Sequence, residues 1–122
     1  MKCALVDTNF LMIPGKFKVD VFAELARLDY KPLLLSCVFS ELTKLASNRG
    51  KVGAHAKVAL VLIDMKRPGM AEARGPADRA LLIHAEKDGC AIATNDMGLI
   101  AKAKMRGITI LRLRQRRYIV EE

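Results

Sequence analysis

The sequence predicts an α/β fold, a three-layer α/β/α sandwich with a central parallel sheet. Two observations predict it. Short apolar runs alternate with segments of helical periodicity along the chain, and the apolar runs end in polar residues, as buried parallel strands do. Strands alternating with helices imply an open sheet covered on both faces. The 122 residues contain no repeat, low-complexity stretch or linker, which indicates one domain over residues 1–122.

The first part of the chain predicts a strand, a helix and a second strand. Residues 3–6 are a short apolar run followed by polar side chains, which is typical of a buried parallel strand. Residues 19–28 carry apolar side chains at helical spacing and predict a helix. Pro32 prevents that helix from continuing, and residues 33–35, three leucines, predict the second strand.

Two helices and a loop are expected next. Residues 38–46 predict a helix that ends near residues 48–50, an Asn-Arg-Gly sequence suited to a helix C-terminus. Residues 52–65 favour a helix and are apolar on nearly every side. We therefore expect this helix to be buried on two faces, within the fold or against a second copy of the chain. Residues 67–75 predict a loop with a short edge strand around residues 70–73.

The remaining elements are expected in the order helix 78–87, strand 90–93, helix 96–106, strand 108–111 and edge strand 118–120. Pro76 suits the first turn of the first of these helices, and Gly89 ends it. Asp96 suits the N-cap of the second helix, and Gly107 ends that one.

Composition and charge limit the classes of function. No apolar run approaches the roughly 20 residues that a membrane-spanning helix needs, so we expect a soluble protein without a membrane partner. The net charge of +8 favours a polyanionic partner, nucleic acid first. Cys3, Cys37 and Cys90 have no paired spacing, and we interpret them as small buried thiols in a reducing compartment, hence a cytoplasmic protein.

Four acidic residues occupy positions from which their carboxylates can converge. Asp7 and Asp96 each follow a predicted strand, and sites in open parallel sheets form at the carboxyl ends of strands. The alternatives are a turn residue for Asp7 and an N-cap for Asp96. Glu41 lies on the apolar stripe of its helix, where a carboxylate is costly unless it is paired, binds metal or reaches water at the stripe's edge. Asp78 lies in a first helical turn, where the helix dipole alone favours it.

Together the four carboxylates predict a site for Mg²⁺ or Mn²⁺. Crowded carboxylates repel one another unless cations neutralise them, and hard oxygen ligands select these ions. In a basic chain such a site suits cleavage of a phosphodiester, because metal ions activate water and stabilise the leaving oxygen while Lys and Arg hold the flanking phosphates. His55 and His84 have no Ser or Cys partner by spacing, and no glycine-rich phosphate loop is present.

Four segments resemble the signature of the PIN-domain family in order and spacing: residues 7–9 (DTN), 36–42 (SCVFSEL), 75–82 (GPADRALL) and 93–96 (ATND). The resemblance implies an α/β/α sandwich and a metal-dependent ribonuclease. The residues that it implies for catalysis and metal binding are Asp7, Glu41, Asp78 and Asp96. The residues that it implies as polar support beside the metals are Asn9, Thr94 and Asn95. Arg79 departs from the family pattern, because many members carry an acid or a small polar residue at this position. The departure leaves open whether the site holds one or two metal ions, and it does not affect the four acids.

Residues 7–25 and 111–122 resemble the branch of the family that processes ribosomal RNA in small-subunit biogenesis, in a stripped-down archaeal form. The resemblance implies an endoribonuclease acting on single-stranded or precursor ribosomal RNA, with a pre-ribosomal partner. One alternative is the toxin ribonuclease of a toxin–antitoxin pair, held by a protein inhibitor. Another is a non-catalytic RNA-binding assembly factor with the same fold.

The densest positive charge lies near the end of the sequence. The candidate RNA-binding residues there are Arg112, Arg114, Arg116 and Arg117. The alternation of the first three predicts guanidinium groups on one side of an extended strand, which suits phosphates. The alternative is a solvated edge strand whose charges block aggregation.

Overall fold

The structure is a computed structural model that describes all residues from 1 to 122. Its strands are β1 (Lys2–Val6), β2 (Tyr30–Leu35), β3 (Gly69–Ala71), β4 (Ala91–Ala93), β5 (Ile110–Arg114) and β6 (Tyr118–Glu121). Its helices are α1 (Thr8–Leu11), α2 (Ile13–Phe17), α3 (Val21–Arg27), α4 (Ser36–Ala46), α5 (Lys51–Lys66), α6 (Ala77–Asp88) and α7 (Met97–Met105). The predicted α/β fold is confirmed.

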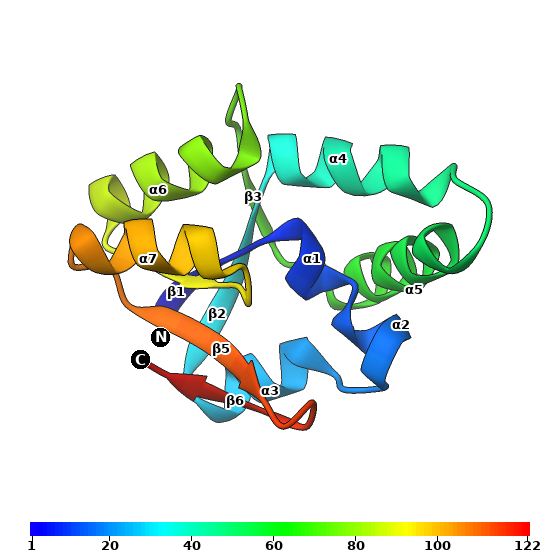
Figure 1. The fold of residues 1–122 in the computed structure, drawn as a ribbon, viewed down its shortest axis with the longest axis horizontal. Coiled ribbons are helices and arrows are strands. Elements are labelled where there is room, and N and C mark those ends of the chain that lie inside the picture. Colours follow the sequence, from blue (N-terminus) through cyan, green and yellow to red (C-terminus); the bar gives the residue numbers. More distant parts are fainter.

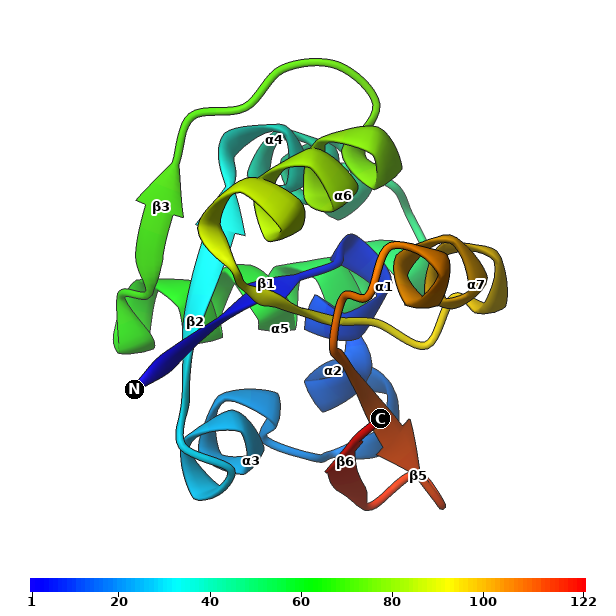
Figure 2. The ribbon, with the colours of Figure 1, turned by 90° about the vertical axis from the view of Figure 1, so that its left-hand side faces the viewer.

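The six strands form one sheet in the order β3-β2-β1-β4-β5-β6. All neighbouring pairs are parallel except β5 and β6, which pair antiparallel at one edge. Figure 2 shows β3 at one edge of the sheet and β5 with β6 at the other. The chain moves outward from β1 to β3 and then crosses to β4 on the other side of β1. The strand order therefore reverses between β1 and β4, and a crevice is expected outside the carboxyl ends of these two strands.

Helices lie on both sides of the sheet, with α6 and α7 on one side and α2, α3 and α5 on the other (Figure 1). The buried apolar side chains form one cluster of 34 residues between these layers. All of β4 and the last three residues of β1 are buried, as expected for parallel strands covered on both faces. None of the helices is long and apolar enough to cross a membrane.

The segment between β1 and α3 holds two short helices that the sequence patterns did not predict. Asp7 is the N-cap of α1, and α2 begins next to Met12 with Pro14 in its first turn. Proline suits a first helical turn because its missing N–H has no helical partner there. The second strand is also longer than predicted, since Pro32 lies inside β2 opposite Ala4.

The helix α5 is not buried on two faces within this chain. One face, which includes Ala56, Ala59 and Ile63, packs into the core, but Val61 is 59% exposed and Met65 is 70% exposed. The expectation of two buried faces is therefore wrong for the fold of one copy. Burial of the outer face against a second copy stays a prediction.

The interpretation of all three cysteines as thiols is wrong in this structure. Cys3 in β1 and Cys90 just before β4 form a disulfide, with their Cα atoms 4.9 Å apart. The pairing of Ala4 with Ala91 in the sheet places the two cysteines side by side. They are 87 residues apart in the sequence, so no local spacing could reveal the pair. Cys37 is the free thiol, and the argument from cysteines for a reducing compartment no longer holds.

Candidate active site

Asp7 lies at the carboxyl end of β1, on one side of the strand-order reversal. Its side chain is buried, with 5% of its surface exposed. Its Oδ1 accepts a hydrogen bond of 2.8 Å from the backbone N–H of Thr8, and its own N–H donates to the carbonyl of Ala93 at 3.1 Å. Asp7 therefore caps a helix, a role that was expected for Asp96 and not for Asp7, and also holds a buried carboxylate at the end of a central strand.

Thr94 connects Asp7 to the segment that follows β4. Its hydroxyl donates a hydrogen bond of 2.8 Å to Oδ2 of Asp7 and accepts one of 3.0 Å from the backbone N–H of Asp96. Thr94 is fully buried, so this connection is shielded from water. Thr94 therefore lies in contact with Asp7, and its support of a metal site stays a prediction.

Asp96 and Asp78 stand at the beginnings of two helices. Asp96 is the N-cap of α7, and its Oδ1 accepts a hydrogen bond of 3.0 Å from the backbone N–H of Leu99. Asp78 lies in the first turn of α6 without capping it. Both side chains are exposed. The beginnings of α6 and α7 lie around the end of β1 in Figure 1.

Three of the four acids interact electrostatically. Burial raises the pKa of Asp7 above its usual range, and the hydrogen bonds from Thr94 and Thr8 offset part of that rise. The negative charges of Asp78 and Asp96 raise the pKa of Asp7 further. A buried carboxylate with two like charges nearby is a site where a cation is favoured.

Glu41 does not face the core. Val38 and Leu42 of the same helix are fully buried, whereas Glu41 is exposed, so its expected place on a buried stripe is wrong and the alternative at the stripe's edge is correct. Glu41 lines a hollow of about 530 Å³ together with Lys44 and Arg74. Burial, with a smaller contribution from the negative charge of Glu41, raises the pKa of the Cys37 thiol, which places these two side chains close together.

The chemistry of the residues around Asp7 fits a hard divalent cation. Their donors are carboxylate oxygens, and the buried hydroxyl of Thr8 beside Asp7 has no hydrogen-bond partner. No three acidic, histidine or cysteine side chains are arranged so that they could hold a metal ion by themselves. The four predicted carboxylates therefore do not form a ready-made cluster in this structure, and Mg²⁺ here would be held by one or two of them and by its own waters.

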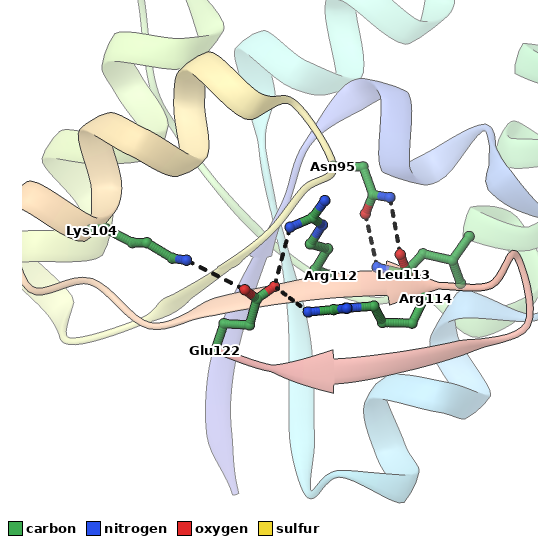
Figure 3. Close-up of polar contacts among 6 residues, drawn as sticks. All are labelled: Asn95, Lys104, Arg112, Leu113, Arg114 and Glu122. Atoms are coloured by element: carbon green, nitrogen blue, oxygen red, sulfur yellow. Dashed lines mark hydrogen bonds and ion pairs between the residues drawn. The ribbon is translucent and has the colours of Figure 1, made fainter.

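Asn9 and Asn95 were both expected beside the metals, but only Asn95 forms side-chain hydrogen bonds in this structure. Asn95 turns to β5, where its side chain accepts a hydrogen bond of 2.8 Å from the N–H of Leu113 and donates one of 3.2 Å to the carbonyl of that residue (Figure 3). It therefore fixes the β4–α7 loop to the neighbouring strand. Asn9 is exposed on α1, two residues after Asp7.

The predicted row of arginines on one strand is correct for two of its members. Arg112 and Arg114 both extend from β5 toward Glu122, at 3.6 and 3.9 Å, and Lys104 approaches the same carboxylate at 3.3 Å (Figure 3). Desolvation opposes ionisation of Glu122, but these cations outweigh it and hold its pKa below the usual range. Arg116 lies beyond the end of β5, in the turn to β6 with a φ of 56°, so it does not continue the row.

Lys44 and Arg74 are candidate site residues that the sequence reasoning missed. Both are exposed and line the same hollow as Glu41. Arg74 directly precedes the segment at residues 75–82 that resembles the family signature, and that position was the available signal. Lys44 follows Glu41 by three residues on α4, a spacing that places two side chains on one helix face.

Two proteins named as ribonucleases are similar to this chain over most of its length. Ribonuclease VapC9 of Archaeoglobus fulgidus is 38% identical to this chain over 124 residues, covering all of this chain and 90% of the relative. Ribonuclease VapC4 of Methanocaldococcus jannaschii is 30% identical over 118 residues, covering 92% and 90%.

A solved structure described as the PIN domain endonuclease Utp24 superposes with a TM-score of 0.76 at 26% identity, covering 98% of this chain and 90% of that one. A domain of a functionally unknown protein from Methanocaldococcus jannaschii shares the fold, with a TM-score of 0.67 at 18% identity and coverage of 93% and 92%. The family described as PIN like domain matches residues 4–116. The chain therefore belongs to the PIN domain family.

Proposed function

We propose that this protein is an endoribonuclease that hydrolyses RNA phosphodiester bonds with Mg²⁺ or Mn²⁺. The observation that carries the proposal is the buried carboxylate of Asp7, whose pKa is raised by burial and by the nearby charges of Asp78 and Asp96. Burial of such a carboxylate is costly unless partners compensate its charge, and the hydrogen bonds from Thr8 and Thr94 offset only part of the rise in its pKa. Two relatives whose names contain the word ribonuclease support the choice of RNA.

In this proposal Asp7 and Asp96 are the principal metal ligands. Asp78 and Glu41 complete the coordination shell of the metal ion or orient the attacking water. A bound divalent ion supplies activation of water and stabilisation of the leaving oxygen. Thr94 keeps the Asp7 carboxylate in place and, through its bond to the Asp96 N–H, fixes the beginning of α7. Lys44 and Arg74, beside Glu41, are positioned to hold a phosphate of the substrate.

The process that we assign first is ribosomal RNA maturation, because residues 7–25 and 111–122 resemble that branch of the family.

The second candidate is a toxin ribonuclease held by a protein inhibitor. The similarity to two ribonucleases named VapC favours it. The exposed apolar side chains of Val58, Val61 and Met65 on α5 offer a surface to such an inhibitor. The same surface would serve a homodimer, which light scattering can detect. We further treat residues 1–122 as one PIN domain, since one apolar cluster extends through the fold.

The test is cleavage of labelled single-stranded RNA and of ribosomal RNA fragments with Mn²⁺ or Mg²⁺. Wild type is compared with Asp7→Asn and Asp96→Asn, and with Asp64→Asn as a matched control. Asp64 is an exposed acid on α5 that takes part in no ion pair. We expect each site variant to lose at least about a hundredfold in rate, which corresponds to roughly 3 kcal/mol of transition-state stabilisation.

Retained cleavage in Asp7→Asn would contradict the assignment of its role. RNA binding without cleavage, equal in all four proteins, would favour the non-catalytic assembly factor. The products of an active wild type distinguish the two processes. Discrete cuts in ribosomal precursor fragments support maturation, and cleavage of other RNAs that stops on addition of a protein inhibitor supports the toxin.

A further inference from the structure

A surface hollow of about 410 Å³ lies next to the acidic centre, within the roughly 300–1,000 Å³ range of ligand-binding clefts. It is lined by Asn9, Met12, Lys16, Lys51, Val52 and His55, from α1, α2 and α5. Asn9 belongs to α1, the helix that Asp7 caps, so the hollow begins two residues from the proposed metal ligand. Figure 1 shows α1 between the end of β1 on one side and α2 and α5 on the other.

The charge of this hollow distinguishes it from three others on the surface. Its lining contains two lysines, Lys16 and Lys51, and no carboxylate. Each of the other three hollows includes two carboxylates in its lining. The pairs are Glu86 with Glu121, Glu41 with Glu72, and Asp20 with Glu24. Neither lysine forms an ion pair with any acid of the chain, so both charges are available to a ligand.

Close packing of two helices brings the backbones at these two lysines near each other. A Cβ atom on Gly15 would lie 3.0 Å from the Cα and 3.3 Å from the Cβ of His55. Any larger residue would therefore push α2 away from α5. Glycine at this position lets the backbone of α2 lie directly on His55 and brings Lys16, the next residue, beside the beginning of α5, where Lys51 lies.

The positive charge continues past the end of α2. The Nζ of Lys16 lies 5.2 Å from the ring centroid of Phe17, and the guanidinium of Arg116 lies 5.1 Å from the same centroid. Two acids lie nearby, but Asp20 pairs with Lys66 and Glu24 pairs with Arg27. Two like charges held near one aromatic ring without a free acid form a surface for a polyanion.

We infer that the RNA strand leaves the acidic centre through this hollow, with successive phosphates bound by Lys16 and Lys51 and, beyond α2, by Arg116. This rests on the proposed function, and it moves the RNA path away from Arg112 and Arg114, whose charges Glu122 already engages. Single-stranded RNA is the occupant that the observations favour, because a flexible backbone can follow a line of separate cations past the half-buried ring of Phe17.

The experiment measures binding of a short fluorescein-labelled single-stranded RNA by anisotropy in EDTA, so that no cleavage occurs, at salt concentrations between about 50 and 200 mM. The test variant is Lys16→Ala/Lys51→Ala. The matched control is Lys87→Ala/Lys102→Ala, which removes the same charge from exposed, unpaired lysines on α6 and α7. Lys16→Arg/Lys51→Arg keeps the charge and serves as the rescue variant.

We expect the test variant to bind at least about tenfold more weakly and its plot of log affinity against log salt to be shallower by about 1.4, since each lost phosphate contact on a single strand reduces the slope by about 0.7. The control and the arginine variant should stay close to wild type. Arg116→Ala should reduce the slope by about 0.7. Equal losses in the test and control variants, or no RNA binding by wild type, would overturn the inference.

The metal-free assay separates this inference from the proposed function. If the lysine variant loses binding as expected but wild type does not cleave RNA with Mn²⁺, the path is correct and the nuclease proposal fails. If wild type cleaves RNA and the lysine variant binds it as tightly as wild type does, the nuclease proposal is correct and the proposed RNA path is wrong.

Discussion

The hydroxyl of Thr94 donates a hydrogen bond of 2.8 Å to the carboxylate of Asp7, from a residue 87 positions away in the chain. The same oxygen accepts the backbone N–H of Asp96 at 3.0 Å. One buried side chain after β4 therefore fixes both the carboxylate at the end of β1 and the first residue of the α7 segment. The bond crosses the boundary between β1 and β4, where the strand order reverses.

Replacing Thr94 by Val should impair cleavage by changing the Asp7 carboxylate. Hydrogen bonds to charged groups contribute about 1.5–3 kcal/mol, so we expect a loss of roughly tenfold or more in kcat with little change in KM. The Thr94 bond also lowers the pKa of Asp7. Its removal should move the acidic limb of the pH–rate profile to higher pH, which a purely structural defect would not do.

Thr94→Ser is the control for that change, because it keeps the hydroxyl and loses only a methyl group. It should restore both the rate and the position of the acidic limb. A serine variant that behaves like the valine variant would show that packing of the methyl group, and not the hydrogen bond, is what matters at this position.

Without metal, Asp7→Asn should be more stable than wild type at neutral pH. The pKa of Asp7 is raised on folding, so the native state holds the proton more tightly than the unfolded state. Stability is then lost as pH rises from the unfolded pKa through the folded pKa, and the loss remains above that window. Asparagine cannot ionise and escapes this cost.

Urea unfolding in EDTA at about pH 4 and at pH 7 measures the effect. The stability advantage of Asp7→Asn over wild type should be larger at pH 7 than at pH 4. A wild type that is more stable than Asp7→Asn at pH 7 would mean that the hydrogen bonds to Asp7 outweigh its burial.

Residues at the ends of strands were predictable from the sequence. Asp7 and Asp96 follow apolar runs in a chain of alternating strands and helices, and the topology of open parallel sheets places such positions at one edge. The boundary of α7 was also predictable, because Asp96 has the side chain that an N-cap needs. These positions follow from the local sequence alone and do not depend on contacts between distant segments.

Other features depended on contacts that no local pattern reports. Glu41 is three residues from buried Val38, yet the width of the buried stripe depends on what packs against α4, and Glu41 falls outside it. The segment around Pro14 and Gly15 gives no helical periodicity because its two helices are only four and five residues long. Lys16 becomes part of a site only because α2 lies on α5, a contact between distant segments.

Addition of Mn²⁺ should raise the thermal unfolding midpoint of wild type if Asp7 and Asp96 bind the ion. A ligand that binds only the folded state at 100 times its Kd stabilises by about 2.7 kcal/mol, which is on the order of 10 °C for a chain of this size. The rise should be abolished in Asp7→Asn and Asp96→Asn and kept in Asp64→Asn. Equal rises in all four proteins would place the ion elsewhere.

The thiol content distinguishes the disulfide from three free cysteines. In denaturant without reductant, a thiol reagent should modify one cysteine per chain, Cys37, and Cys37→Ser should abolish the reaction. Reduction should lower the free energy of unfolding by about 2–4 kcal/mol, because the Cys3–Cys90 bond closes a long loop of 87 residues and restricts the unfolded chain. Three reactive thiols in the unreduced protein would restore the interpretation of Cys3 and Cys90 as buried thiols, and unfolding would then be insensitive to reductant.

Metal-dependent cleavage should be the same before and after reduction at temperatures well below unfolding. The disulfide lies toward the beginnings of β1 and β4, whereas Asp7 and Thr94 lie beyond the ends of these strands.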